Sequence, residues 1–309
     1  GGGSLRCAAM NTKLARLALP VALLTTTLLL AACGGDASEE SADLGPDPIA
    51  LAPADVPFYA EVVVRPQGDL GDDLKSALTK VTGEEDPAQM VIDELNESLA
   101  ENSDMTYEDD IEPWLGSRAG IFVSGFQVDT EQPDVAVVIA TTDADAAKSS
   151  ADSATESDDP TEESYEGIDY KLDPDDGTAI GVDQDFLVIG TEQGFKDAVD
   201  AGAGESLETN GDAPAALDAA PDNSILSMYV DGAKVADLLK ASPELDAAQL
   251  EQLEPSLEQI PDGPVEGWAA VTDSSFSFGG SAPTPEGVPA PSEMISTLPS
   301  DAWFAVAAA

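Results

Sequence analysis

Three short apolar segments separated by tight turns constrain the fold of this chain more than any other feature. The segments span residues 167–172, 178–182 and 186–190 and have the composition of β-strands. Residues 173–177 and 183–185, which connect them, are too short to form a crossover helix, so the strands must be antiparallel neighbours. This pattern excludes a doubly wound parallel sheet and predicts an α+β fold, with a mainly antiparallel sheet and packed helices.

Hydrophobic periodicity predicts the remaining elements. Segments of strand composition lie at residues 57–64, 119–126, 135–140, 225–230, 265–271 and 275–278, and the continuous apolar run 135–140 is typical of a central strand. Residues 149–164 are poor in apolar side chains and predict an exposed, mobile loop. Helical spacing predicts helices at residues 70–81, 86–99, 143–151, 192–201, 232–241 and 245–257.

A short opening motif recurs along the chain. Residues 53–55 read Pro-Ala-Asp before the first strand, residues 221–222 read Pro-Asp before a later strand, and residues 299–301 read Pro-Ser-Asp after a Pro-rich segment. The recurrence predicts repeated strand-turn-helix units, with the last copy cut off within its first strand. The chain is therefore expected to be a fragment of a longer protein.

The N-terminal region has the pattern of a bacterial lipoprotein signal. Counting from Met10, the expected start, Lys13 and Arg16 supply positive charge ahead of an apolar stretch. That stretch contains Pro20 and is shorter than the roughly 20 residues of a spanning helix, which favours cleavage. The alternative is an ordinary secretory signal with a chance cysteine. The lipobox consists of Leu30, Ala31, Ala32 and Cys33.

Lipidation would place the mature protein at the membrane surface. The two acyl chains of a diacylglyceryl group on Cys33 would anchor the protein stably to the extracytoplasmic face of the cell membrane. The sequence thus predicts a signal peptide at residues 10–32 and a disordered acidic tether at 33–50. An α+β domain is expected at 51–282, and a Pro-rich linker with the truncated start of a second repeat at 283–309.

The chain is strongly acidic. It has 61 Asp and Glu residues against 12 Lys and Arg residues, which gives a formal net charge of −49. Such a surface repels nucleic acid and anionic headgroups, so we expect no nucleic-acid partner and a domain that stands away from the bilayer. Solubility in a saline habitat and capture of cations such as Ca²⁺ both remain open as reasons for the charge. The even spread of acids favours solubility.

The missing residue types restrict the chemistry. The chain has no histidine, and its two cysteines are Cys7, upstream of the expected start, and Cys33. This excludes His-dependent triads, free-thiol nucleophiles, thiolate or imidazole zinc sites and an intrachain disulfide in the mature form. Carboxylate chemistry, hydroxyl–lysine pairs and oxygen-ligated metals are left.

Several short motifs together resemble one family. They are the lipobox, the acidic tether, the strand opening at 51–58, the Pro-Trp-Leu-Gly corner at 113–116, and the Val-Ile-Gly strand end at 188–190 that precedes Phe195. The combination resembles bacterial envelope lipoproteins that carry a domain of unknown function of the 3352 type. The resemblance spans residues 51–304 and implies an α+β repeat with a second copy following. It implies no catalytic residues.

Candidate sites within the domain are weak. Asp173, Asp175 and Asp176 invite a calcium interpretation, but their spacing and the intervening proline do not fit an EF-hand, so a plain hairpin turn is favoured. Lys75 and Lys171 lack the Ser-x-x-Lys context of a serine–lysine nucleophile. Trp114 and Trp268 lie in apolar contexts typical of a core rather than of a glycan-binding groove.

These observations favour a non-catalytic, lipid-anchored protein of the cell envelope. Its α+β domain is expected to bind a partner protein, a wall polymer or cations, without a cofactor. One alternative is the solute-binding receptor of a transporter, which would have two parallel-sheet lobes around a cleft. A carboxylate-based glycan hydrolase is the other alternative and would need an aromatic-lined groove.

Overall fold

The computed structural model describes residues 44–100, 103, 105–127, 132–155, 160–241, 249–250, 252–253 and 263–283. Strands form where apolar residues alternate or run continuously, and turn residues end them. One example of such a turn residue is Gly177, which has a positive φ of 79°. The strands are β1 (Phe58–Val63), β2 (Leu115–Gln127), β3 (Gln132–Thr141), β4 (Thr161–Tyr165), β5 (Ile168–Leu172), β6 (Thr178–Asp183), β7 (Phe186–Thr191), β8 (Ser224–Asp231), β9 (Pro264–Thr272) and β10 (Ser275–Ser281).

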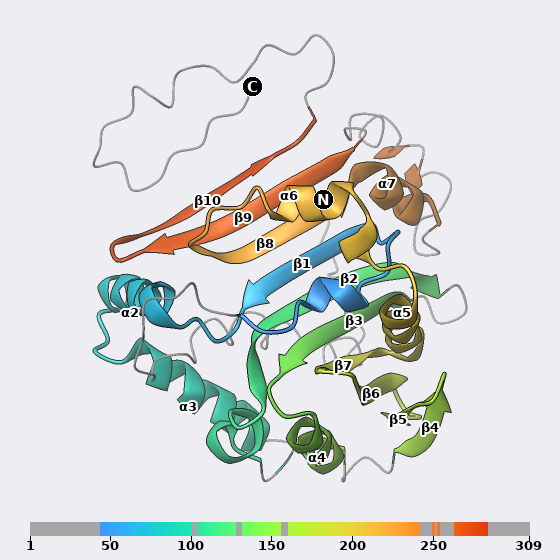
Figure 1. Ribbon diagram of the computed structural model, residues 1–309, viewed down its shortest axis with the longest axis horizontal. Coiled ribbons are helices and arrows are strands. Elements are labelled where there is room, and N and C mark those ends of the chain that lie inside the picture. Colours follow the sequence, from blue (N-terminus) through green and yellow to red (C-terminus); the bar gives the residue numbers. More distant parts are fainter. Residues whose placement is uncertain are drawn as a thin grey trace, which may run out of the picture.

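All ten strands belong to one sheet, with the order β10-β9-β8-β1-β2-β3-β7-β6-β5-β4 (Figure 1). Every neighbouring pair is antiparallel. The predicted α+β fold with a mainly antiparallel sheet is therefore confirmed. The predicted central strand is also confirmed, because β3 pairs with β2 on one side and β7 on the other and is buried along most of its length.

Several helices begin at residues whose side chains accept a hydrogen bond from an amide group of the first turn. The Asp143 side chain accepts from the Ala146 amide, and the Thr191 hydroxyl accepts from the Gly194 amide. The helices are η2 (Pro48–Leu51), α2 (Gly68–Thr82), α3 (Pro87–Ala100), the π-helical turn η3 (Tyr107–Ile111), α4 (Ala144–Ala154), α5 (Glu192–Ala203), η4 (Leu207–Thr209), α6 (Asp212–Leu217) and α7 (Gly232–Ala241). None of the helices in the described ranges has the length and apolar character needed to cross a bilayer.

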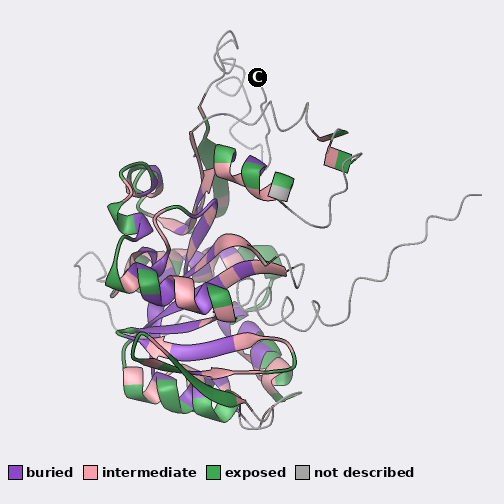
Figure 2. Cartoon of the chain, turned by 90° about the vertical axis from the view of Figure 1, so that its right-hand side faces the viewer, coloured by how far each residue is buried: buried purple, intermediate pink, exposed green. Residues whose placement is uncertain are grey.

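Helices cover both faces of the sheet, and buried residues concentrate between the layers (Figure 2). Ala136 and Val138 of β3 belong to the cluster formed with η2 and α5, which includes the fully buried Phe195. Val137 and Ile139 belong to the opposite cluster with α3 and α4. This division follows from the two-residue period of a strand.

Two glycines, Gly190 on β7 and Gly194 on α5, allow these elements to approach β3 closely. A Cβ atom on Gly190 or Gly194 would overlap the carbonyl oxygen of Val135 at the start of β3. Backbone at this distance leaves no room for a side chain, so glycine is required at both positions for steric reasons. The close packing holds α5 against β3 and β7, next to the strands that carry the candidate site.

Two copies of the predicted strand-turn-helix unit are visible in the sheet. The opening at residues 53–55 leads into β1 and then α2, and the opening at 221–222 leads into β8 and then α7. β1 and β8 pair with each other, with Tyr59 opposite Tyr229. The third opening, at residues 299–301, lies outside the described residues.

The structure corrects one sequence prediction and extends others. The predicted loop 149–164 is wrong at both ends, because α4 continues to Ala154 and Thr161–Tyr165 forms β4. β4 is an exposed edge strand with polar side chains, so its composition resembles that of a loop. α6 was not predicted. The folded part begins before residue 51, because η2 packs on the sheet with its Ile49 and Leu51 buried.

The N-terminal and C-terminal predictions lie mainly outside the described residues. These are the signal peptide at 10–32, most of the tether at 33–50, and nearly all of the linker and repeat start at 283–309. Most of the predicted helix at 245–257 is outside them as well.

Candidate functional site

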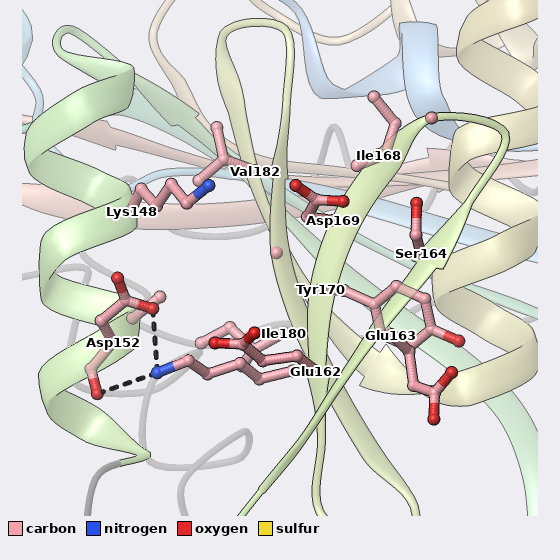
Figure 3. A pocket seen from close by; sticks show the side chains of 14 residues that line it. Lys148, Asp152, Glu162, Glu163, Ser164, Ile168, Asp169, Tyr170, Ile180 and Val182 are labelled. Carbon is pink, nitrogen blue, oxygen red and sulfur yellow. Dashed lines mark hydrogen bonds and ion pairs between the residues drawn. The ribbon is translucent and has the colours of Figure 1, made fainter.

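An open cleft of about 590 Å³ lies between α4 and the strands β4, β5 and β6 (Figure 3). α4 forms one wall and the β4–β5 hairpin the other, while β6 supplies the floor. Polar side chains dominate the walls. They are Lys148 and Asp152 from α4, Glu162 and Ser164 from β4, and Asp169 and Lys171 from β5, with Ile180 and Val182 of β6 between them.

Residue spacing explains why these side chains converge. Lys148 and Asp152 are four residues apart and share one face of α4, whereas the neighbouring alanines of this helix pack on the sheet. On β5, Lys171 lies on the side of α4, and Tyr170 points to the opposite face. There the Tyr170 ring packs on Phe195, with ring centroids 4.7 Å apart.

The two lysines of the cleft differ in their partners. Lys171 Nζ lies 2.9 Å from Asp152 Oδ1 and also donates to the Asp152 carbonyl oxygen at 3.5 Å. Lys148 has neither a hydrogen bond nor an ion pair with any side chain of the described ranges, and its ammonium points from α4 into the cleft (Figure 3). The cleft therefore offers one uncommitted cation, and the carboxylates of Asp169 and Glu162 also line it.

This arrangement suits a ligand with mixed polar groups. A free ammonium accepts an anionic group as a charge-assisted hydrogen-bond partner. Nearby carboxylates accept hydrogen bonds from hydroxyl, amide or amino groups. The Lys171 ammonium is paired with Asp152 and not with a serine hydroxyl, so the serine–lysine arrangement considered from the sequence is not formed there.

The three aspartates singled out from the sequence form a hairpin turn between β5 and β6. The Asp173 side chain accepts from the Asp175 amide at 2.7 Å, and the Asp176 side chain accepts from the Thr178 amide at 2.9 Å. Gly177 supplies the left-handed residue of the turn with φ of 79°. Within the described ranges, no three or more acidic side chains group closely enough to hold a metal ion. The carboxylates of Asp173 and Asp176 thus shape the turn.

A second charged cluster lies on the other face of the sheet, beneath η2. Arg118 of β2 makes ion pairs with Asp47 at 2.8 Å and with Glu61 of β1 at 3.3 Å. The Tyr59 hydroxyl donates to Glu61 Oε2 at 3.0 Å, and the Tyr59 side chain is fully buried. Sequence reasoning missed this cluster, because its members are far apart in the chain.

Burial shifts the acid–base properties of this cluster. Desolvation, and then the negative charge of Asp47, raise the pKa of Glu61 to about 7, although Arg118 opposes the shift. Desolvation, and then the charge of Glu61, also raise the pKa of Tyr59 well above its usual value. Since the Glu61 side chain is only 14% exposed, a substrate has little access to it, and the cluster is best understood as structural.

The cluster fixes the point at which the N-terminal segment meets the sheet. The Asp47 side chain caps η2 by accepting from the Ile49 amide at 3.2 Å. Arg118 Nη2 donates to the Gly45 carbonyl oxygen at 3.0 Å. Arg118 therefore connects the segment before η2 to the central strands β1 and β2.

Comparisons with known proteins identify a family but give no activity. A family model described as "Protein of unknown function (DUF3352)" matches residues 79–260, which is more than half of the chain. No curated protein matches the chain.

Two solved structures are similar at a low level. Crystal form I of TP0453 is 12% identical with a TM-score of 0.34, covering 76% of this chain and 77% of that chain. Crystal form III of TP0453 is 12% identical with a TM-score of 0.35, covering 76% of this chain and 78% of that chain. Similarity at this level supports no inference about function.

Proposed function

Because this chain belongs to the DUF3352 family, whose function is unknown, we propose a role from its own residues: a lipid-anchored, non-catalytic binding protein of the cell envelope. The observation that carries the proposal is the cleft between α4 and β4–β6, where the ammonium of Lys148 is uncommitted and the carboxylates of Asp169 and Glu162 also line the walls. We propose this cleft as the binding site.

The lipobox supports the envelope location. Residues 30–33 read Leu-Ala-Ala-Cys after an apolar stretch, and the segment that follows is short and acidic. An anchored protein of this charge is repelled by anionic headgroups, so the folded domain would face outward from the membrane, toward the wall.

A Cys33→Ala variant tests the anchor. Without the thiol that receives the diacylglyceryl group, the precursor is expected to stay uncleaved and unlipidated. Metabolic labelling with a radioactive fatty acid and the electrophoretic mobility of the chain measure both effects. Normal processing and labelling of the variant would show that residues 30–33 are not a lipobox.

The residue inventory supports a binding role over catalysis. The chain has no histidine, and its carboxyl with a pKa raised to about 7, Glu61, lies under η2 rather than in the cleft. In the cleft, Lys171 is tied to Asp152, and Tyr170 points away from α4. A glycan hydrolase would need two carboxyls across an aromatic-lined groove, and Tyr170 is the one aromatic residue among those that line this cleft.

The fold also bears on the receptor alternative. A transporter's solute receptor of the expected kind has two parallel-sheet lobes with a cleft between them. The described strands instead form one continuous antiparallel sheet, and the cleft lies between a helix and one end of that sheet. The architecture therefore gives this alternative no support.

The cleft chemistry favours a wall-polymer segment as the ligand. The site is an open cleft between α4 and the β4–β5 hairpin, so an extended chain fits it better than an enclosed small molecule. It offers one cation and several carboxylates, which complement a ligand that carries carboxylates as well as hydroxyl or amino groups. Peptidoglycan fragments have this combination, whereas uniformly anionic polymers are repelled by a chain of net charge −49.

Charge reversal at Lys148 tests the site. Soluble protein from residue 34 onward is expected to bind purified soluble peptidoglycan fragments, and Lys148→Glu is expected to weaken binding at least about tenfold. The reason is that a hydrogen bond to a charged group contributes roughly 1.5–3 kcal/mol, and the substitution replaces it with repulsion. Isothermal titration calorimetry measures the affinity, and NMR shifts locate the bound fragment.

Lys75→Glu is the matched control, because it makes the same charge change on α2, outside the cleft. It is expected to leave the affinity close to that of the unmodified protein. Absence of binding by the unmodified protein, or equal weakening by the two variants, would refute the proposed site.

A further inference from the structure

The two edges of the sheet differ in their protection against further strand pairing. β4 forms one edge and carries the exposed Glu162 and Glu163, and charged side chains discourage another strand from pairing there. β10 forms the other edge, with the sequence Ser-Phe-Ser-Phe-Gly-Gly-Ser, and has neither a charge nor a proline. Among the described residues, β10 pairs with β9 alone.

Both faces of the β10 edge present apolar surface. Phe278 is 77% exposed, the largest exposed fraction among the large apolar side chains of the described ranges. Phe276, on the same face, packs into the cluster under α2. On the other face the Trp268 ring lies where a Cβ atom of Gly279 would be, so it extends toward the open edge. A strand added here would cover Phe278 on one face and the border of Trp268 on the other.

The chain itself contains a segment suited to this edge. Pro299, Asp301 and Phe304 repeat the spacing of Pro53, Asp55 and Phe58, and Phe58 is the first residue of β1. Residues 304–309, which lie outside the described ranges, read Phe-Ala-Val-Ala-Ala-Ala and carry no charge.

The places of the first two copies in the sheet restrict the third. β1 lies between β8 and β2, and β8 lies between β9 and β1, so neither has a free side. A third strand can therefore join the sheet only at an edge. The charges of Glu162 and Glu163 discourage pairing at the β4 edge, which leaves the β10 edge. The connection from residue 282 to 303 is long enough to span the length of β10 and bring residues 304–309 alongside it. A flexible chain of this length has an end-to-end distance of roughly 25 Å, and a seven-residue strand is about 23 Å long.

We propose that residues 304–309 pair with β10 and extend the sheet by one strand. The pairing is intramolecular, so it avoids the repulsion that two copies of net charge −49 would meet. It also satisfies the outer amide and carbonyl groups of β10 and covers Phe278.

Hydrogen–deuterium exchange of the full chain tests the pairing. Val306→Pro removes an amide donor and is incompatible with a paired strand, so peptides covering residues 275–281 are expected to exchange at least about tenfold faster in this variant. Ser292→Pro is the matched control, because it places the same residue in the connection, and it is expected to exchange like the unmodified chain. Peptides of β3 report that the core is intact in both variants.

Three other outcomes would overturn the proposal. One is fast exchange of residues 275–281 in the unmodified chain, which means an unpaired edge. Another is equal protection in all three proteins. The last is protection that disappears on dilution together with a dimer-to-monomer change in light scattering, which would assign the edge to a second copy of the chain.

Discussion

Replacing Arg118 with methionine is expected to lower the free energy of unfolding by about 3–5 kcal/mol at pH 8. Its guanidinium pairs with Asp47 and Glu61, and the side chains of Arg118 and Glu61 are only 17% and 14% exposed. Removing one partner of a buried pair leaves the other charge without compensation in a poorly solvated site. The bond from Arg118 to the Gly45 carbonyl is lost as well, so η2 should loosen with the substitution.

Urea unfolding followed by circular dichroism measures the Arg118→Met effect. Lys240→Met is the control, because Lys240 is 57% exposed in its pair with Asp237 and should contribute below about 1 kcal/mol. Adding Glu61→Gln to Arg118→Met is expected to recover a large part of the loss, since it removes the uncompensated charge. A loss for Arg118→Met no greater than that of Lys240→Met would mean that the cluster is well solvated.

Local signals predicted much of the fold. The short turns at residues 173–177 and 183–185 fixed the antiparallel β5-β6-β7 meander, because connections of this length permit no other pairing. Helix α3 begins at Pro87, one residue after the predicted start at residue 86, and the apolar run at 135–140 forms the buried part of β3. These features depend on neighbours within a few residues, which is the range over which sequence patterns carry information.

Edge and terminal elements lacked such signals. β4 has the polar composition of a loop, and its pairing with β5 is visible only when the two segments lie side by side. α6 has only six residues, with a proline in its first turn, so it is too short to show a helical period. The sequence predicts that Asp47 belongs to an acidic tether, because nothing local indicates that its carboxylate meets Arg118, 71 residues along the chain.

The cleft was beyond prediction for a related reason. Lys148 and Lys171 are ordinary lysines in sequence, and only the packing of α4 beside β5 places them on one cleft. The spacing of Lys148 and Asp152 on one helical face was a usable local signal. It does not indicate that the opposite wall is the β4–β5 hairpin, since the loop predicted at residues 149–164 covers most of β4.

The raised pKa of Glu61 makes stability depend on pH in a direction opposite to that of most acids in proteins. Its folded-state pKa of about 7 lies above the ordinary value of 4.5. Between these pH values the folded protein holds a proton that the unfolded chain releases, so the free energy of unfolding falls as the pH rises. The contribution is complete below about pH 4.5 and is lost above about pH 7. Asp47, Tyr59 and Arg118 are the ionisable groups that face this carboxyl.

Glu61→Gln is therefore expected to change the pH profile more than the stability at any single pH. As the pH rises from 5 to 8, ionisation of Glu61 should lower the free energy of unfolding of the unmodified protein by about 2–3 kcal/mol. The variant should not show this decrease. The amide oxygen still accepts from Tyr59, so the packing is kept. Urea unfolding at several pH values measures both profiles, and Glu163→Gln, which removes a carboxyl from the exposed edge strand β4, corrects for the loss of one negative charge. Parallel profiles for Glu61→Gln and Glu163→Gln would mean that Glu61 is ionised throughout this range, and that burial beneath η2 does not hold its proton.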